Sequence, residues 1–447
     1  MRFLGSLAWI GLIVFSSVFA ADAQEKPARP SVEPQNLSPL PPEEKPTRIL
    51  SWDDCIALAA QRNPTLVAAE YAKNASRYSY FSSYNALLPN LSLSNTFTHN
   101  NNSGGVQVGS PNLYTGQATA NMTLFNLASI ANIKSTKASY SQTQANLRNA
   151  SATLRYNLLS AFANVYFSQA SLDMTRRIAA IQEKNADEVA LRYQSGNEYK
   201  GNMMNAKAQL LVAQVNVVQA IRSLRAAEKQ LDQYLGLDEF DAVTVTGTLV
   251  AQTPPDLPAH LDDFLQNRPD VALQEAVVKS ARASLLSSES PLLPNLSATF
   301  SRYREAPYEF PSTTYLGSYG ATLSFPIFGG GPASTYFNVK SAKNTLENQE
   351  QTLRAVRVAA IYNLENAWAN YANAVDQAVG EQAVLESYRQ RYQEGAIRYA
   401  SGLLTFDNWQ VIVTQWVGAE QTAINDWQAA VVTQAAWEQA LGKALGE

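Results

Sequence analysis

The sequence has few residues of the kinds that perform chemistry. Among its 447 residues there are one cysteine, Cys55, and two histidines, His99 and His260. A single cysteine excludes an intramolecular disulfide and a thiolate zinc cluster, and two histidines are too few for a histidine metal cage. Neither histidine lies in a nucleophile-and-base pattern. We therefore expect no catalytic residue, no metal site and no cofactor, and we expect that the protein is not an enzyme.

Charge is also scarce. Charged residues make up 16% of the chain, the formal net charge is −4 and the mean hydropathy is −0.20, whereas soluble domains carry about 25% charged residues. A slightly acidic chain lacks the basic surface that nucleic-acid binding needs, so we expect no nucleic-acid partner. At about 150 residues per domain, the length alone would allow about three domains.

Long apolar runs are missing after the first residues of the chain. Arg2, the apolar stretch 4–19 and the Ala21-Asp22-Ala23 site form the pattern of a signal peptide, which we place at residues 1–23. A retained membrane anchor is the alternative, although the stretch is short for about 30 Å of hydrocarbon. Cys55 lies far beyond the predicted cleavage site, so we expect no lipid attached to a cysteine at the N-terminus of the mature chain. The pattern predicts export to the periplasm, the cell exterior or the outer membrane.

A proline-rich segment follows, and we assign residues 24–48 to an extended N-terminal tether. Its prolines are Pro27, Pro30, Pro34, Pro39, Pro41, Pro42 and Pro46.

The rest of the chain is a tandem duplication. Four short motifs recur in the same order, displaced by 205 or 206 residues. They are Asn63-Pro64 with Arg268-Pro269, the LPNLS segments that start at Leu88 and Leu293, the RYxSG segments that start at Arg192 and Arg398, and Leu235-Gly236 with Leu441-Gly442. We therefore predict two repeats, 49–236 and 261–447, joined by a linker, 237–260, that contains a short strand at 243–250.

Each repeat begins with a helix and continues into two strands. Ser51 and Asp54 form a capping-box pattern, and the Asn63-Pro64 break precedes a helix over 65–87, whose copy is 270–290. At each LPNLS segment the hydrophobic period changes from helical to alternating. The alternation predicts strands at about 90–98, 113–125, 295–304 and 314–326, each about as long as a tilted membrane-spanning strand.

The alternation separates an apolar face from a polar face. Phe97, Tyr114, Tyr315 and Phe325 lie on the apolar face near strand ends, and we predict that they form a lipid-facing aromatic girdle. The other face is rich in Ser, Thr and Gln, which suits a wet lumen. Alternation alone also allows a soluble sheet with one wet face. Four strands cannot close a barrel, and an open edge is not viable in hydrocarbon, so several chains must pool their strands.

Two very long helices follow the strand pairs. The segments 127–195 and 333–401 are 69 residues each, and a helix of that length extends about 100 Å, several times the apolar thickness of a bilayer. Seven-residue spacing of apolar residues predicts left-handed supercoiling. The spaced residues are Leu147, Leu154 and Ala161 in one series and Leu158, Val165, Leu172, Ala179 and Ala186 in another. A dimeric coiled-coil rod is the alternative interpretation of these helices.

Each long helix is expected to end at its RYxSG motif, where Gly196 and Gly402 can adopt the left-handed conformation that terminates a helix. Returning helices are predicted at 202–235 and 403–441. The result is a helical hairpin in each repeat, with its turn far from the strands.

These motifs resemble the TolC-like family of outer-membrane efflux proteins, over about residues 50–442. The resemblance implies an α+β membrane protein in which a homotrimer forms a 12-stranded β-barrel, four strands per chain, continued by a long periplasmic α-helical barrel. It also implies partners, namely a periplasmic adaptor (membrane fusion) protein, an inner-membrane ABC or RND pump, and outer-membrane lipid. By resemblance, the periplasmic tip that contacts the adaptor contains Arg192, Tyr193, Gly196, Arg398, Tyr399 and Gly402.

Family members often carry acidic residues just after the second tip glycine, where they form a ring in the pore. Asp407 is the corresponding pore-gate candidate here, although it lies one position off the expected pattern and the first repeat has Lys200 and Asn202 in that region. The expected function is a passive, gated exit duct across the outer membrane and periplasm, within a tripartite efflux pump or type I secretion system. The alternative is a trimeric structural or adhesive outer-membrane protein with a coiled-coil stalk.

Overall fold

A computed structural model describes residues 48–99, 112–237, 242–257, 261–306, 315–326 and 331–446. The predicted signal peptide and nearly all of the predicted tether lie outside these residues, as does His260. Arg48, which the sequence places in the tether, is the first residue of strand β1 (Arg48–Leu50). The tether boundary predicted at residue 48 is therefore one residue too late.

The first repeat opens with two capped helices, α1 (Trp52–Arg62) and α2 (Pro64–Ser83). The predicted capping box is present, since the Ser51 hydroxyl accepts from the Asp54 backbone N–H at 3.3 Å and the Asp54 carboxylate accepts from the Ser51 N–H at 3.0 Å. Asn63 caps α2, and Pro64 occupies its first position, where no N–H is needed. A short 3₁₀ turn, Tyr84–Leu87, replaces the end of the helix predicted to Leu87.

The second repeat has the same start in a modified form. A 3₁₀ segment, η2 (Leu261–Asn267), precedes α5 (Pro269–Ser288), and a further 3₁₀ turn, η3 (Ser290–Leu292), follows it. The helix predicted at 270–290 therefore ends two residues early, because Pro291 enters a separate turn.

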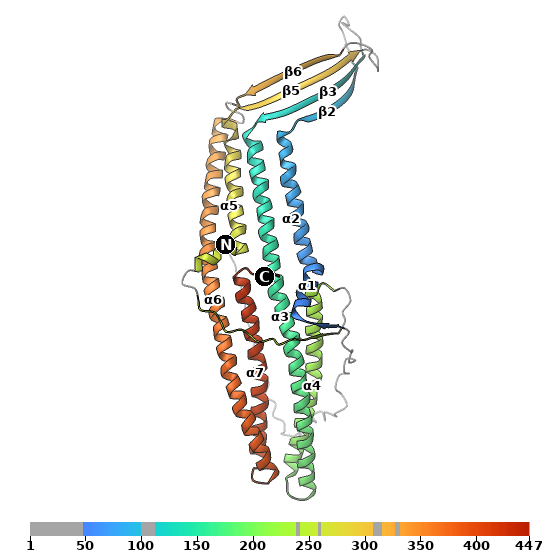
Figure 1. Ribbon diagram of the computed structural model, residues 1–447, viewed down its shortest axis with the longest axis vertical. Helices are drawn as coiled ribbons and strands as arrows, with labels where there is room; N and C mark the ends of the chain where they lie inside the picture. Colours follow the sequence, from blue (N-terminus) through green and yellow to red (C-terminus); the bar gives the residue numbers. More distant parts are fainter. Residues whose placement is uncertain are drawn as a thin grey trace, which may run out of the picture. The chain divides into compact units, whose positions relative to one another are not determined.

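The four long strands form one antiparallel sheet in the order β2-β3-β5-β6, with both hairpins side by side (Figure 1). They are β2 (Asn90–His99), β3 (Asn112–Phe125), β5 (Asn295–Ala306) and β6 (Leu316–Ser324). Ala120 lies opposite both Leu91 and Phe300, and Phe300 lies opposite Tyr319, so the apolar residues share one face as the alternation predicts. In this chain β2 and β6 are edge strands.

A β-bulge interrupts the alternation at the end of β3. Thr123 pairs with Ser297, but the next pair is Phe125 with Leu296, so Leu124 is the extra residue. A bulge bends its strand and increases the local twist, and this one lies just before the chain enters the long helix.

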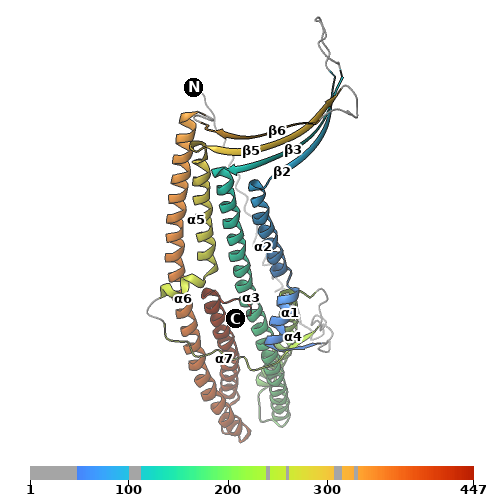
Figure 2. The ribbon, with the colours of Figure 1, turned by 45° about the horizontal axis from the view of Figure 1, so that its top comes forward.

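The long helices are α3 (Leu127–Gln194) and α6 (Pro332–Ala400), and the returning helices are α4 (Lys200–Leu235) and α7 (Phe406–Ala440). Near the sheet the helices lie in the order α2, α3, α5, α6; farther away the order is α4, α3, α7, α6 (Figures 1 and 2). The predicted supercoil positions are mostly buried. Leu154, Leu158, Ala161, Val165, Leu172 and Ala186 are buried, whereas Leu147 and Ala179 are partly buried.

A third heptad series on α3 was not predicted. Four alanines recur every seven residues and are each at most 3% exposed: Ala131, Ala138, Ala145 and Ala152. Ala138 and Ala283 line the same cavity between α3 and α5, which shows that this series faces α5. Side chains this small allow the two helix axes to approach closely.

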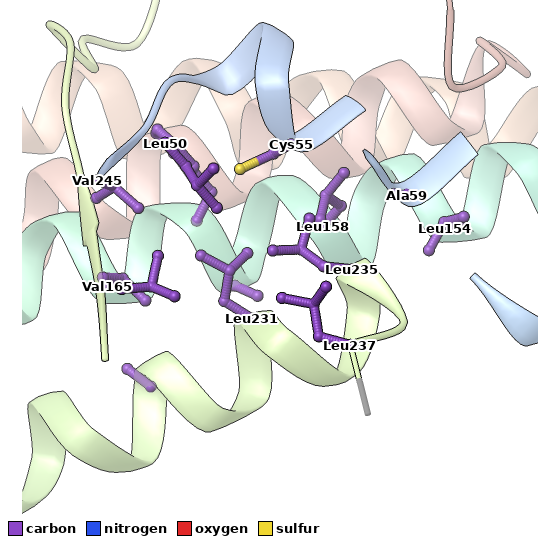
Figure 3. Packing of buried hydrophobic residues seen from close by; sticks show 14 of the residues in the cluster. Leu50, Cys55, Ala59, Leu154, Leu158, Val165, Leu231, Leu235, Leu237 and Val245 are labelled. Carbon is purple, nitrogen blue, oxygen red and sulfur yellow. The ribbon is translucent and has the colours of Figure 1, made fainter. Parts of the chain in front are cut away.

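The core of the first repeat joins α1, α3 and α4 to a small sheet (Figure 3). Strand β4 (Val243–Val245) pairs in parallel with β1. It is shorter than the strand predicted at 243–250, because β1 supplies only three residues to pair with. Cys55 is fully buried in this core, and burial raises the pKa of its thiol to about 12, so the thiol stays protonated and unreactive.

The duplicated motifs meet within each repeat. Gly236 (φ 72°) lies against the backbone of Arg62 and Asn63, and the Asn63 side-chain amide donates to the Tyr234 carbonyl at 2.9 Å. In the second repeat, Gly442 (φ 81°) lies against the backbone of residues 267 and 268, and the Arg268 guanidinium donates to the Ala440 carbonyl at 2.6 Å. The Leu-Gly end of each repeat therefore docks onto the X-Pro start of the same repeat.

The C-terminal residues join the second repeat to the first. Leu445 is 3% exposed in the first repeat's core, and its N–H donates to the Ser151 hydroxyl at 3.0 Å. Beside it, Arg155 of α3 donates to the Glu438 carboxylate of α7 through Nε at 3.1 Å and Nη2 at 2.8 Å. Both side chains are only 13% exposed, and Lys443 approaches the other oxygen of Glu438 at 3.4 Å.

Among the described helices, none combines the length and the apolar character that crossing a membrane would require.

Candidate functional site

The two hairpin turns are built alike, as their shared RYxSG motif predicts. Gly196 (φ 76°) and Gly402 (φ 74°) adopt the left-handed conformation. In the first turn, the Asn197 N–H donates to the Arg192 carbonyl at 2.8 Å and the Gly196 N–H to the Tyr193 carbonyl at 3.0 Å. The second turn repeats both bonds at 2.9 and 3.0 Å. This is the Schellman pattern, and it explains why glycine recurs at this position.

The first hairpin holds the second through Arg192. Its Nη2 donates to the Tyr399 carbonyl at 3.0 Å and to Glu188 at 2.8 Å, and its guanidinium carbon lies 4.5 Å from the centre of the Tyr399 ring. Arg192 thus combines a charge-assisted hydrogen bond with a cation–π contact. We call this contact between Arg192 and Tyr399 the tip latch.

An aromatic stack stabilises the second hairpin. Tyr399 lies parallel to Trp409, with ring centres 5.6 Å apart, and Tyr392 packs on Trp409 at 5.3 Å and on Trp416 at 4.3 Å. Gly395 permits this approach, because a Cβ there would meet Ile412 at 3.1 Å. The stack also touches the first hairpin, since the Trp409 indole N–H donates to the buried Asn185 side chain at 3.2 Å.

Of the four stacked positions, three are not aromatic in the first hairpin; Tyr399 alone has an aromatic counterpart there, Tyr193. At the displacement of 206 residues, Tyr392, Trp409 and Trp416 correspond to Ala186, Met203 and Leu210. Sequence reasoning missed the stack, although the seven-residue spacing of two tyrosines and of two tryptophans was a usable signal.

The six predicted tip residues do not share one environment. Tyr193 and Arg398 are exposed at the turns, and Arg192 is partly buried. Tyr399 is only 3% exposed, and burial raises the pKa of its hydroxyl while Arg192 opposes that shift. The stack and the tip latch cover the Tyr399 side chain in this arrangement, and the contact of the six tip residues with an adaptor stays a prediction.

Asp407 lies in the first turn of α7, and its side chain is exposed between the buried Phe406 and Trp409. A carboxylate is favourable at a helix N-terminus, where the helix dipole is positive. This placement is compatible with a side chain that faces a pore.

The predicted girdle residues lie toward both ends of the sheet. Phe97 and Tyr114 are a cross-strand pair with ring centres 4.8 Å apart, near the strand ends away from the helices. Tyr315 lies just before β6, and Phe325 just after it, next to the helices. Phe97, Tyr315 and Phe325 are all more than half exposed in this chain, and their contact with lipid stays a prediction.

Two arginines that the sequence analysis missed share the apolar face with this girdle. Arg302 lies opposite Ala118 and Arg304 opposite Gly116. Their guanidinium carbons lie 4.7 and 4.2 Å from the centre of the Tyr315 ring. Charged residues on the outer face of a membrane barrel cost little near the interface and much at mid-depth. If this face meets lipid, as predicted, their position places a membrane interface at this end of the sheet.

On the opposite face, Gln117 donates to the Ser301 hydroxyl at 2.9 Å between two strands. No group of three or more potential metal ligands occurs in the part of the chain that the structure describes. The described residues offer packing between the two hairpins and a polar sheet face.

The solved structures most similar to this chain include outer-membrane channels. A crystal structure of CusC, described in terms of folding and transmembrane channel formation, matches with a TM-score of 0.80 and 17% identity, over 94% of this chain and 98% of that one. The open state of the Neisseria gonorrhoeae MtrE outer membrane channel matches with a TM-score of 0.76 and 19% identity, over 88% of this chain and 89% of that one. These similarities show a common fold.

The sequence comparisons agree with the fold. A curated relative, the pyoverdine export outer membrane protein OpmQ of Pseudomonas putida, is 28% identical over 287 residues. That match covers 57% of this chain and 55% of the relative, so it spans about half the length of each. The outer membrane efflux protein family matches residues 55–237 and 260–443, which is most of the chain in two segments. The chain therefore belongs to the outer membrane efflux protein family, with a TolC-like fold and a location in the outer membrane.

Proposed function

We propose that this protein is a passive, gated exit duct that assembles as a homotrimer. Four strands from each chain would form a 12-stranded β-barrel, and the helices would continue it as a periplasmic α-barrel. The observation that carries this proposal is that each chain has two open edges, one along β2, α2 and α4 and the other along β6 and α6.

Both edges expose large apolar side chains. On α2, Tyr71 is 71% exposed and Tyr78 67%. On α6, Phe337 is 63% exposed and Tyr362 66%. Soluble surfaces rarely leave such side chains grouped along one element, and a neighbouring copy would cover them. The edge strands β2 and β6 would likewise pair across copies, which satisfies backbone groups that hydrocarbon cannot.

The same proposal includes partners. A duct without an energy source needs one elsewhere, so we propose a periplasmic adaptor protein that contacts the hairpin tips and an inner-membrane ABC or RND pump. The polar strand face suits the lining of a duct. The relative OpmQ is a pyoverdine export protein, which supports outward transport by this protein as well.

Native mass spectrometry of the detergent-solubilised protein, together with planar-bilayer conductance, tests the duct. We expect a trimer and stable single channels. A monomer, or a trimer that never conducts, would overturn the proposal. Cleavage of the long helices by protease added to intact cells would instead favour an adhesive stalk on the cell surface, because periplasmic helices are protected.

We expect Arg192→Ala to favour an open tip. The substitution removes a charge-assisted hydrogen bond and a cation–π contact between the two hairpins. At about 1–2 kcal/mol, their loss would shift a closed-to-open equilibrium by a factor of roughly 5–30. The measurement is the open fraction in planar bilayers. Arg398→Ala is the matched control, because Arg398 is the same motif position in the second repeat and is exposed. Equal effects of both substitutions would contradict the proposal that the tip latch holds the tip closed.

We also expect Asp407→Asn to weaken block by multivalent cations. Three copies of this exposed carboxylate near a pore axis would attract such cations, and the amide keeps the size without the charge. The readout is the blocker concentration that halves the conductance, which should rise about tenfold. An unchanged concentration would show that Asp407 faces solvent away from the pore.

A further inference from the structure

Charge is distributed unevenly on the helices just below the sheet. The first 46 residues of α3, 127–172, contain no aspartate or glutamate, but they contain Lys134 and Lys137 near the start of the helix. Across from them, α5 carries Lys279 and Arg282. This local excess of cations contrasts with the net charge of −4 for the whole chain.

These four cations line one cavity between α3 and α5. Its volume is about 500 Å³. Ala138 and Ala283, both buried, leave the room for it. Leu285 and Leu286 provide an apolar wall, and Glu289 is the one carboxylate among the described lining residues. We call this cavity the α3–α5 cavity.

Most of the positive charge in the cavity is not neutralised by the chain. Arg282 pairs with Glu350 at 3.1 Å. Lys134, Lys137 and Lys279 form no ion pair with any residue that the structure describes, and all three are exposed. Three lysines held around one cavity repel each other, and an anion bound among them would relieve that repulsion.

In the proposed duct, the cavity lies within reach of the lipid headgroups. The LPNLS motifs at the strand–helix junction expose apolar side chains, with Leu88 at 57% and Leu293 at 41%. Exposed leucines at this junction would contact the periplasmic edge of the hydrocarbon core of the membrane. Lys134 is seven residues into α3, or about 10 Å below the junction at the rise of a helix, and headgroup layers are about 5–8 Å thick. Long lysine side chains reach several ångströms toward the boundary.

The cavity opens on the outer side of the helix layer. Lys134 precedes Phe162 by four heptads, so both point to the same side of a supercoiled α3. Phe162 packs against Trp52 of α1, with ring centres 5.7 Å apart. In a ring of three copies, α1 and the β1–β4 sheet would obstruct the duct if they lay inside, so that side must be the outside.

We infer that the α3–α5 cavity binds the phosphate-bearing headgroup of an anionic phospholipid from the periplasmic leaflet of the outer membrane. This inference rests on the proposed duct, which sets the membrane boundary and the outer side. The lysines contact the phosphate, and Leu285 and Leu286 contact the glycerol and the first part of the acyl chains. Bound lipid would fix the depth of the protein in the membrane at the joint between sheet and helices.

The test compares lipid binding by three forms of the full-length protein in native mass spectrometry. They are the wild type, a cavity variant with Lys134→Ser, Lys137→Ser and Lys279→Ser, and a control variant with Lys184→Ser, Lys200→Ser and Lys207→Ser. The control lysines are exposed and lie far from the sheet, and both variants lose the same charge. The probes are phosphatidylglycerol, phosphatidylcholine and inorganic phosphate.

We expect wild type and control to bind phosphatidylglycerol at least about tenfold better than phosphatidylcholine, and the cavity variant to lose that preference. A preference that persists in the cavity variant, or that is absent from the wild type, overturns the inference. Displacement of phosphatidylglycerol by millimolar phosphate would assign the cavity to a soluble anion instead. A conducting trimer without lipid preference refutes only this inference, whereas a monomer that never conducts refutes the proposed duct.

Discussion

Replacing Gly236 with alanine is expected to destabilise the protein by about 3–5 kcal/mol. Gly236 has φ 72°, which is costly for any residue with a Cβ. A Cβ at this position would also overlap the carbonyl oxygen of Arg62 and lie 2.7 Å from its carbonyl carbon. Both atoms belong to backbone, so the clash can be relieved only by separating the end of the repeat from its start.

Thermal unfolding followed by circular dichroism measures this effect. The midpoint should fall by about 5 °C or more, and less folded protein should reach the outer membrane. Gly442→Ala should act in the same direction but less strongly, because its Cβ would meet the Asn267 carbonyl oxygen at 2.9 Å.

Gly196→Ala is the matched control for Gly236→Ala. Its φ of 76° is nearly the same, but a Cβ there would meet nothing within 4 Å. We expect a loss of about 1 kcal/mol, the cost of the left-handed conformation alone. If the two substitutions lower the midpoint equally, the docking of the repeat end onto its start contributes no stability.

The second large effect is expected for Arg155→Met. This substitution leaves the Glu438 carboxylate, 13% exposed, without the two hydrogen bonds that Arg155 donates. Removing one partner of a buried pair costs about 3–5 kcal/mol, and the residual exposure and the nearby Lys443 reduce this to about 2–3 kcal/mol. The contact between α3 and the C-terminal residues should loosen, which limited proteolysis near residue 445 would detect.

The double variant Arg155→Met with Glu438→Leu separates the cost of an unpaired buried carboxylate from the contribution of the ion pair. Because no carboxylate remains buried, we expect its stability to return to within about 1 kcal/mol of the wild type. A double variant as unstable as Arg155→Met alone would mean that the ion pair itself, and not the orphaned carboxylate, determines the loss.

The regular elements were predictable because each shows its own period. The two-residue alternation located the four strands, and the absence of proline and glycine over 127–195 located α3. The duplication predicted two equivalent hairpins. The bulge at Leu124 was not predictable, because it depends on how β3 meets β5 and α3 rather than on the composition of β3.

The two RYxSG motifs predict the same backbone turn but not the same burial of their side chains. Tyr193 and Tyr399 occupy the same place in the same motif, yet one is 38% exposed and the other 3%. The difference comes from their neighbours, since Trp409 stacks on Tyr399, whereas the residue equivalent to Trp409 in the first repeat is Met203. A motif determines the local backbone, but burial depends on side chains more distant in the sequence.

The alanine heptad on α3 has a consequence for how the proposed ring would move. Going around such a ring, a narrow seam of alanines between α3 and α5 would alternate with a broad seam of aromatics between α6 and the next copy's α2. Narrow seams of small residues resist sliding, whereas large side chains can change rotamer and repack. Motion would therefore concentrate at the three seams between copies, so the ring would open and close with threefold rather than sixfold symmetry.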